Sequence, residues 1–145
     1  MGLDREKVTE VLNEIVELEL AGAVRYTQYS LMVFGHARIP IMDWMREQTQ
    51  EALDHAVQAG EEVTALGEQV SLGIGELVGT HHASVDDMMH EMLVHERKGV
   101  TLYNRLLEVS QGESVALEEL ARAMIRSEER HVSEIEKMLR RRGDA

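Results

Sequence analysis

The sequence of 145 residues contains no cysteine, a single proline and only 3% aromatic residues. The absence of cysteine excludes disulfides, thiolate metal sites and cysteine nucleophiles. No segment approaches the roughly 18 consecutive apolar residues that a membrane-spanning helix requires. The N-terminal stretch MGLDREKVTE also lacks the apolar core of a signal peptide. We therefore expect a cytoplasmic protein that does not enter a membrane.

Positive charge is scarce as well. The chain has 15 Lys and Arg against 27 Asp and Glu, for a formal net charge of −12. Because such a chain repels the phosphates of nucleic acids, we do not expect a nucleic-acid partner. The same charge favours the binding of cations, although an acidic surface can also serve solubility alone.

The residues that are present favour helices. Apolar residues make up 43% of the chain, and Glu, Leu, Ala, Met, Arg and Gln are good helix formers. The amphipathic periodicity predicts helices over about 4–34, 41–66, 85–110 and 115–142. Asp4, Ser84 and Ser114 are suited to cap three of these helices at their N-termini.

The lengths of the connections predict the topology. GHARIP and QGES, residues 35–40 and 111–114, are short loops, so each flanking pair of helices should form an antiparallel hairpin. Residues 67–83 form a much longer connection that contains several glycines. These lengths favour an all-α four-helix bundle, a single domain over residues 1–145, in which a long crossover joins two hairpins.

Carboxylates interrupt the apolar stripes of these helices. In the first predicted helix the stripe contains Glu19, Gly22 and Tyr26, and the third helix repeats these three residues 77 positions later as Glu96, Gly99 and Tyr103. The same displacement carries Glu51 of the second helix onto Glu128 of the fourth. The pattern indicates two copies of one hairpin, with a carboxylate in the middle of every helix.

The histidines depart from this repeat by one position. His131 follows Glu128 by three residues, whereas His55 follows Glu51 by four. Both spacings place the two side chains on one face of a helix, but one residue turns a helix by about 100°. We therefore take His55 as the partner of Glu51 and keep Asp54 as an alternative ligand. A local bulge in the second helix would also reconcile the two spacings.

This set of residues points to a pair of metal ions. Ionised carboxylates in a bundle core need partners, protons or cations. Oxygen ligands with one imidazole per metal suit iron or manganese, and zinc can compete. The predicted metal ligands are Glu19, Glu51, His55, Glu96, Glu128 and His131, and all of these except His55 are also the predicted catalytic groups. In this scheme Glu51 and Glu128 each serve mainly one metal, and Glu19 and Glu96 complete or bridge the site.

Other polar and apolar residues receive simpler interpretations. Tyr26 and Tyr103 are expected to be core residues with satisfied hydroxyls, and the alternatives are that they hydrogen-bond a metal ligand or donate an electron. His95 is also expected to be exposed to solvent, with the alternative that, beside Glu96, it supports that ligand. Solvent exposure is expected for four other histidines and one glutamate, namely His36, His81, His82, His90 and Glu47. A position in the core or on a dimer face is expected for three methionines, namely Met88, Met89 and Met92.

Two motifs resemble those of a known family. Residues 19–26, ELAGAVRY, resemble the first-helix motif of the ferritin-like superfamily, and of bacterioferritin in particular, in which a Tyr follows the metal-binding Glu by seven residues. Residues 128–131, EERH, resemble its last-helix motif Glu-Glu-x-His. The resemblance extends from about residue 5 to 140 and implies two iron ions per subunit. It also implies oxidation of Fe(II) by dioxygen or peroxide, for iron homeostasis or detoxification.

The sequence also departs from that family. Ala52 stands where the family has its haem-ligating Met, so haem is not expected. The chain stops soon after the fourth helix, which favours a homodimer or small homo-oligomer over a 24-subunit shell. Three alternatives remain: a manganese or mixed-metal oxidase or catalase, a bundle with a structural or sequestering metal such as zinc, and a metal-free bundle with protonated or hydrogen-bonded carboxylates.

Overall fold

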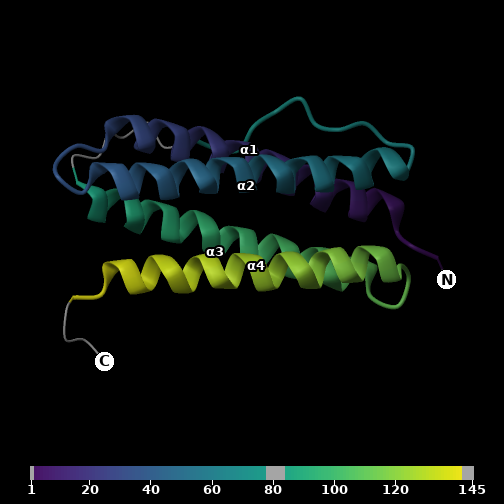
Figure 1. The fold of residues 1–145 in the computed structure, drawn as a ribbon. Helices are drawn as coiled ribbons and strands as arrows, with labels where there is room; N and C mark the ends of the chain where they lie inside the picture. Colours follow the sequence, from purple (N-terminus) through teal and green to yellow (C-terminus); the bar gives the residue numbers. More distant parts are fainter. Residues whose placement is uncertain (1, 78–83, 142–145) are drawn as a thin grey trace.

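The computed structural model describes residues 2–77 and 84–141, and within them it is an all-α structure (Figure 1). The helices are α1 (Arg5–Met32), α2 (Arg38–Ala65), α3 (Val85–Ser110) and α4 (Val115–Leu139). This confirms the predicted fold class. In the described part of the chain, no helix is long and apolar enough to span a lipid bilayer.

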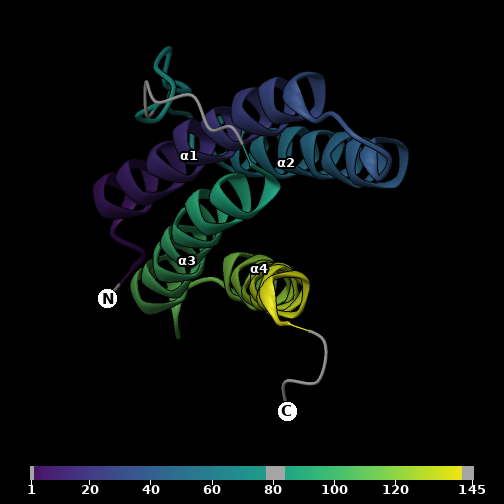
Figure 2. The ribbon, with the colours of Figure 1, turned by 90° about the vertical axis from the view of Figure 1, so that its left-hand side faces the viewer.

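The helices form two antiparallel hairpins that lie one on the other (Figures 1 and 2). α1 packs on α2, α3 packs on α4, and the packing of α1 against α3 joins the hairpins. The described part of the crossover is tied to α1, because the amide of Gly75 donates a hydrogen bond to the carbonyl of Glu17 at 2.7 Å. A Cβ atom on residue 75 would lie 2.9 Å from that carbonyl oxygen, so only glycine allows this approach.

Side chains and glycines at the helix ends determine where the helices begin and end. The three predicted N-caps form, since Asp4, Ser84 and Ser114 accept hydrogen bonds from the amides three residues later. α2 ends in a Schellman motif, in which the amides of Gly67 and Glu68 bond to the carbonyls of Thr64 and Val63.

Three predicted boundaries are wrong by a few residues. α2 begins at Arg38 rather than at residue 41, because Pro40 lies in the first turn, where its missing N–H is not needed. α1 ends at Met32 rather than at residue 34, and Gly35 follows with a left-handed φ of +101°. α4 ends at Leu139, short of residue 142, which lies outside the described residues.

The internal repeat has two registers rather than one. Every buried residue of α3 lies 77 positions after a buried residue of α1 or its C-cap. From Ala121 onward, the buried residues of α4 lie 76 positions after the buried residues of α2. The loop over residues 33–37 is one residue longer than the loop over residues 111–114. The displacement of 77 residues is therefore wrong for the second and fourth helices.

The apolar core consists of two clusters on either side of a polar centre. One cluster lies towards the N-terminal end of α1 and includes Leu12, Ile15 and Leu117. The other includes Tyr29, Met45 and Ile135, together with the buried Met88, Met89 and Met92. These three methionines are core residues, which was one of the two positions expected for them; the other was a dimer face. Met138, by contrast, is 40% exposed and does not extend the stripe of α4.

Candidate metal centre

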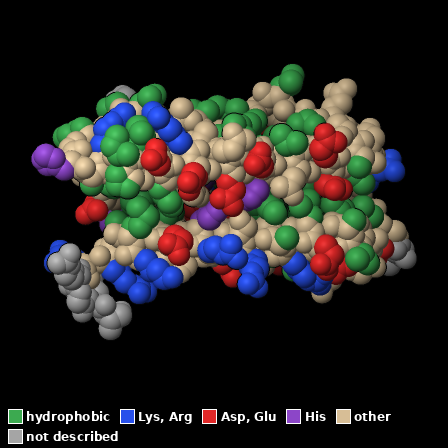
Figure 3. All heavy atoms as spheres, viewed as in Figure 1, with side chains coloured by type: hydrophobic (Ala, Val, Ile, Leu, Met, Phe, Trp, Pro, Cys, Tyr) green, Lys and Arg blue, Asp and Glu red, His purple; other side chains and the backbone are tan. Residues whose placement is uncertain are grey.

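The polar centre brings together the six residues that the sequence singled out, one or two from each helix. Glu19, His55, Glu96 and Glu128 are buried. The side chain of His131 is 13% exposed and that of Glu51 is 40% exposed. Figure 3 shows His side chains and acidic side chains together in the middle of the face between the hairpins. The centre is therefore enclosed by the bundle but reaches solvent near Glu51.

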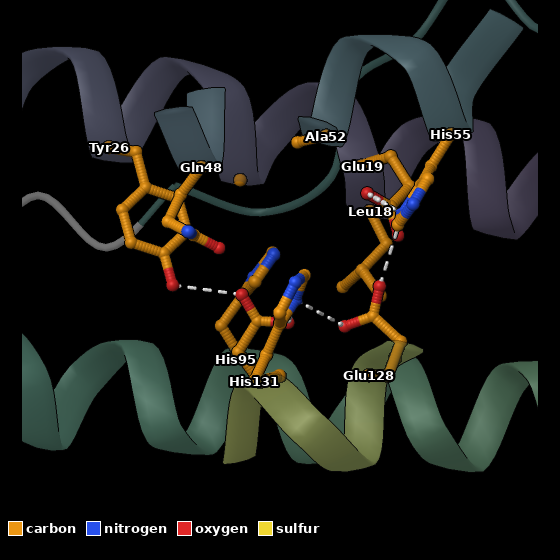
Figure 4. A pocket seen from close by; sticks show the side chains of 12 residues that line it. Leu18, Glu19, Tyr26, Gln48, Ala52, His55, His95, Glu128 and His131 are labelled. Carbon is orange, nitrogen blue, oxygen red and sulfur yellow. Dashed lines mark hydrogen bonds and ion pairs between the residues drawn. The ribbon is translucent and has the colours of Figure 1, made fainter. Parts of the chain in front are cut away.

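Glu19, His55 and Glu128 form the first group that could hold a metal ion. The Nδ1 atom of His55 lies 3.6 Å from a carboxylate oxygen of Glu19 and 3.3 Å from Oε1 of Glu128. One donor atom from each residue lies within 4.8 Å of the other two. Figure 4 shows the three side chains converging from α1, α2 and α4.

Glu96, Glu128 and His131 form the second group. The Nδ1 atom of His131 lies 3.6 Å from Oε2 of Glu96 and 3.7 Å from Oε2 of Glu128. Glu128 thus turns one oxygen towards each histidine. The two imidazole rings are stacked, with centroids 6.4 Å apart. In this geometry Glu128 is the shared carboxylate, whereas Glu19 and Glu96 each belong to one group, which differs from the pairing expected from the sequence.

The donor atoms fit metal ions in two respects. The Nδ1 atoms of His55 and His131 are buried and make no hydrogen bond, although carboxylate oxygens lie near them. Buried polar atoms without partners are rare in proteins. Metal bonds of about 2.0–2.2 Å to nitrogen and oxygen bring two donors to about 3–4 Å from each other. The separations of 3.3–3.7 Å around each Nδ1 atom suit such an ion.

Without metal, the centre retains protons at neutral pH. Burial lowers the pKa of His55, but Glu128 and Glu19 outweigh this effect and raise it to about 10. Burial also lowers the pKa of His131, but Glu128 and Glu96 outweigh this effect and raise it to about 11. Burial and the neighbouring Glu128 raise the pKa of Glu96 to about 7, against the effect of His131.

We expect metal binding to release protons. At pH 8 both imidazoles are charged in the metal-free protein, since their pKa values are about 10 and about 11. An ion bound at Nδ1 must displace one proton from each ring, so affinity should fall about tenfold per site for each unit by which the pH is lowered. Calorimetric titration with Zn(II) in buffers of different ionisation enthalpy should report about two protons for two ions. Binding without proton release would contradict the assignment of the two histidines.

Two tyrosines hold the carboxylates of Glu96 and Glu19 in place. The hydroxyl of Tyr26 donates to Oε1 of Glu96 at 2.9 Å, and that of Tyr103 donates to Oε1 of Glu19 at 3.2 Å. Burial, followed by the nearby carboxylates, raises the pKa of both tyrosines well above the usual range. Both hydroxyls therefore remain donors at neutral pH. Two of the expectations for these residues, a core position and a hydrogen bond to a carboxylate of the centre, describe what the structure contains.

Gly99 leaves room for the shared carboxylate, because a Cβ atom at this position would lie 3.3 Å from Oε2 of Glu128. We expect Gly99→Ala to weaken metal binding by roughly tenfold, as changes beside a metal ligand do. The helix itself should gain up to about 1 kcal/mol, the difference in propensity between the two residues. Zn(II) titration and chemical unfolding measure the two effects separately. Gly60→Ala is the matched control, since its Cβ atom would meet Val70 at an ordinary 3.7 Å. Equal affinities in the two variants would contradict the prediction.

Several residues that were considered as alternative ligands or as exposed groups lie away from the centre. Asp54 is exposed and accepts a hydrogen bond from the side chain of Gln50 at 3.1 Å. α2 is an uninterrupted helix, so the bulge considered for it is absent. Glu47, His36 and His90 are exposed, and His81 and His82 lie outside the described residues.

Three residues that the sequence did not single out for the centre line its cavity, namely Leu18, Gln48 and Ala52. His95 lines the cavity as well, and burial lowers the pKa of its imidazole. Gln48 and Ala52 belong to the buried face of α2, with Met45 one turn before them. The sequence signal that could have identified Gln48 is a polar residue on the apolar stripe of α2. Nothing in the sequence marked Leu18, and Ala52 was noted only as the residue at the position of the family's haem-ligating Met.

Comparison with known proteins gives one family and several solved structures. The family model described as a ferritin-like domain matches residues 9–142. No curated protein sequence matches the chain. A dodecameric thioferritin, the bacterioferritin-related protein of Bacteroides fragilis, is 17% identical with a TM-score of 0.88, over 95% of this chain and 87% of that chain.

Two further structures have the same arrangement of helices. A ferritin-like diiron-carboxylate protein from Bacillus anthracis str. Ames is 21% identical with a TM-score of 0.85, over 97% of this chain and 100% of that chain. The bacterioferritin of Rhodobacter capsulatus is 20% identical with a TM-score of 0.83, over 96% of this chain and 86% of that chain. At these identities the likeness establishes the fold.

Proposed function

The chain belongs to the ferritin-like domain family, and from this premise we propose that its polar centre binds two Fe(II) ions and oxidises them. The observation that carries the proposal is Glu128, which turns one oxygen towards each of two histidine Nδ1 atoms that lack hydrogen bonds. Glu19 with His55, and Glu96 with His131, complete the two groups. Iron is the substrate in this scheme, and dioxygen or peroxide is the oxidant.

The reaction needs two electrons, and two Fe(II) ions supply one each. Dioxygen accepts these two electrons with two protons and becomes hydrogen peroxide, or hydrogen peroxide accepts them with two protons and becomes two waters. The residues of this chain bring the two ions together and offset their charge with buried carboxylates. Tyr26 and Tyr103 orient Glu96 and Glu19 through their hydroxyls. The apolar clusters on both sides limit the access of water.

The test is a titration of the metal-free protein with Fe(II) under anaerobic conditions, followed by exposure to dioxygen while ultraviolet–visible absorbance is recorded. We expect two equivalents per subunit and the appearance of ferric absorbance. Binding of one equivalent or none would overturn the proposal. Tight binding of two ions without oxidation would favour a structural or sequestering role instead, and manganese or zinc would then be the ions to test.

We also propose that the chain self-associates through the outer face of α1 and α2. A groove there is lined mostly by apolar residues, among them Leu20, Leu53 and Val57, and Val57 is 63% exposed. Covering such residues removes apolar surface from water. The thioferritin of Bacteroides fragilis is dodecameric by its description, which supports assembly without giving its size here.

Val57→Glu should lower the mass of any assembly, because a carboxylate in an apolar interface costs several kcal/mol, or more than about 100-fold in affinity. Sedimentation velocity of the two proteins at equal concentration measures this. Gln58→Glu is the matched control, since Gln58 is an exposed neighbour outside the groove. If Val57→Glu leaves the mass unchanged, this face is not the contact.

A further inference from the structure

α2 contributes an imidazole to the centre but no carboxylate that faces it. The buried positions of α2 and α4 correspond with a displacement of 76 residues, so His55 is the counterpart of His131 and Ala52 is the counterpart of Glu128. Glu51 lies one position before this buried stripe, and its side chain is 40% exposed. Glu51 belongs to neither of the groups that could hold a metal among the described residues.

Glu51 instead lies behind the two imidazoles. Its Oε2 atom is 3.0 Å from Nε2 of His131, and its Oε1 atom is 3.9 Å from Nε2 of His55. The hydroxyl of Ser127 donates to Oε1 at 3.3 Å and orients the carboxylate. The opposite nitrogens, the Nδ1 atoms, face the inner carboxylates. A carboxylate behind a metal-binding histidine fixes its tautomer and ring orientation.

The edge of the centre that faces α2 is therefore lined by small and neutral groups. Ala52 and Gln48 are the α2 residues, besides His55, that line the cavity of the whole centre, which has a volume of about 10 Å³, about the space that one water needs. Gln48 is 8% exposed, and its Oε1 atom is buried without a hydrogen bond. Figure 4 shows Ala52 and Gln48 on the α2 side of the centre, opposite the side chains of α4.

We infer that Glu51 is a positioning residue for the two histidines rather than a metal ligand, and that the edge at Ala52 stays open to a small exogenous ligand. This inference rests on the proposed metal binding. Charge indicates the class of ligand, because three inner carboxylates, Glu19, Glu96 and Glu128, leave one positive charge when two divalent ions are bound. A small anion, or a water that loses a proton, would offset that charge. The Oε1 atom of Gln48, a buried acceptor without a hydrogen bond, can accept one from such a water or from the hydroxide that it forms.

The first experiment separates a positioning role from ligation. Co(II) is the probe, because its visible spectrum reports its coordination. Glu51→Gln keeps the shape of a half-exposed side chain, and we expect it to bind two Co(II) ions about 10–100-fold more weakly, with a shifted spectrum. Glu51→Asp should restore part of the affinity. A Glu51→Gln protein that binds only one ion or none, at Co(II) concentrations that saturate a 100-fold weaker site, would overturn the inference.

The second experiment tests the open edge. Adding fluoride, an anion about the size of one water, to the Co(II)-loaded protein should change its visible spectrum, and Ala52→Glu should abolish this change while two ions remain bound. Gln58→Glu is the control, since Gln58 is exposed on α2 and lines neither this cavity nor the groove of α1 and α2. If Ala52→Glu does not fold, the shorter Ala52→Asp makes the same test. No response to fluoride in the unmodified protein, or an undiminished response in the folded variant, would overturn the open edge.

The two proposals fail in different ways. If the unmodified protein does not bind two metal ions, the proposed function fails and the inference fails with it. If the unmodified protein binds two ions and Glu51→Gln loses one, only the inference fails, because Glu51 is then a ligand as the sequence predicted.

Discussion

Glu128→Gln is expected to remove tight binding of both metal ions and to lower the rate of Fe(II) oxidation by at least about 100-fold. One oxygen of Glu128 lies 3.3 Å from Nδ1 of His55 and the other lies 3.7 Å from Nδ1 of His131, so a single carboxylate serves both groups. Gln keeps the shape but not the charge. Loss of a charged ligand in a buried site costs several kcal/mol, and about 2.7 kcal/mol already corresponds to 100-fold.

Metal content after equilibrium dialysis and the initial rate of ferric absorbance measure the two effects. Glu129→Gln is the matched control, because it removes the same charge one position along α4 from an exposed residue. We expect this control to bind two ions and to oxidise Fe(II) at the unmodified rate. Normal binding by Glu128→Gln would refute the shared role of this residue.

Loading the metal-free protein with Zn(II) should raise its melting temperature by roughly 10–20 °C. An ion that binds only the native state stabilises it by about 2.7 kcal/mol when its concentration is 100 times the dissociation constant. Two sites then contribute about 5 kcal/mol, and for a chain of this size each kcal/mol moves the melting temperature by about 2–4 °C. The physical cause is that folding brings the carboxylates and imidazoles together from four helices.

Calorimetry with and without Zn(II) measures this shift, and a chelator should reverse it. Glu128→Gln should show less than about half of the shift, because it weakens both sites. A bundle whose buried carboxylates are held by protons alone would melt at the same temperature with and without Zn(II). That result would favour the alternative of a bundle that binds no metal.

Much of the fold could be predicted from sequence because it depends on local interactions. The spacing of apolar residues placed the helices, and Asp4, Ser84 and Ser114 cap three of them through the hydrogen bonds expected of such residues. Helix boundaries were predicted less accurately where a single residue changes the free energy of forming the first turn, as at Pro40. Loop lengths predicted the hairpins, since a short loop leaves the chain no alternative to an antiparallel neighbour.

The second helix shows where sequence spacing became insufficient. Glu51 and His55 are one turn apart, so the sequence placed both on one face and could not tell which of them faces the core. The extra residue in the loop over 33–37 shifts the phase of α2 relative to α4. This shift turns Ala52 and His55 inwards and leaves Asp54 exposed. The choice between His55 and Asp54 depends on that phase.

The sequence by itself determined the four amphipathic helices, their pairing into hairpins and the acidic and imidazole groups available to the centre, because these follow from periodicity, capping and composition. Only the tertiary structure decided which atoms face one another. Packing of one hairpin on the other set the rotation of each helix, and this rotation placed Glu128 between two histidines and Glu51 behind them. One residue of phase turns a side chain by about 100°, which separates a group inside the centre from one at its edge.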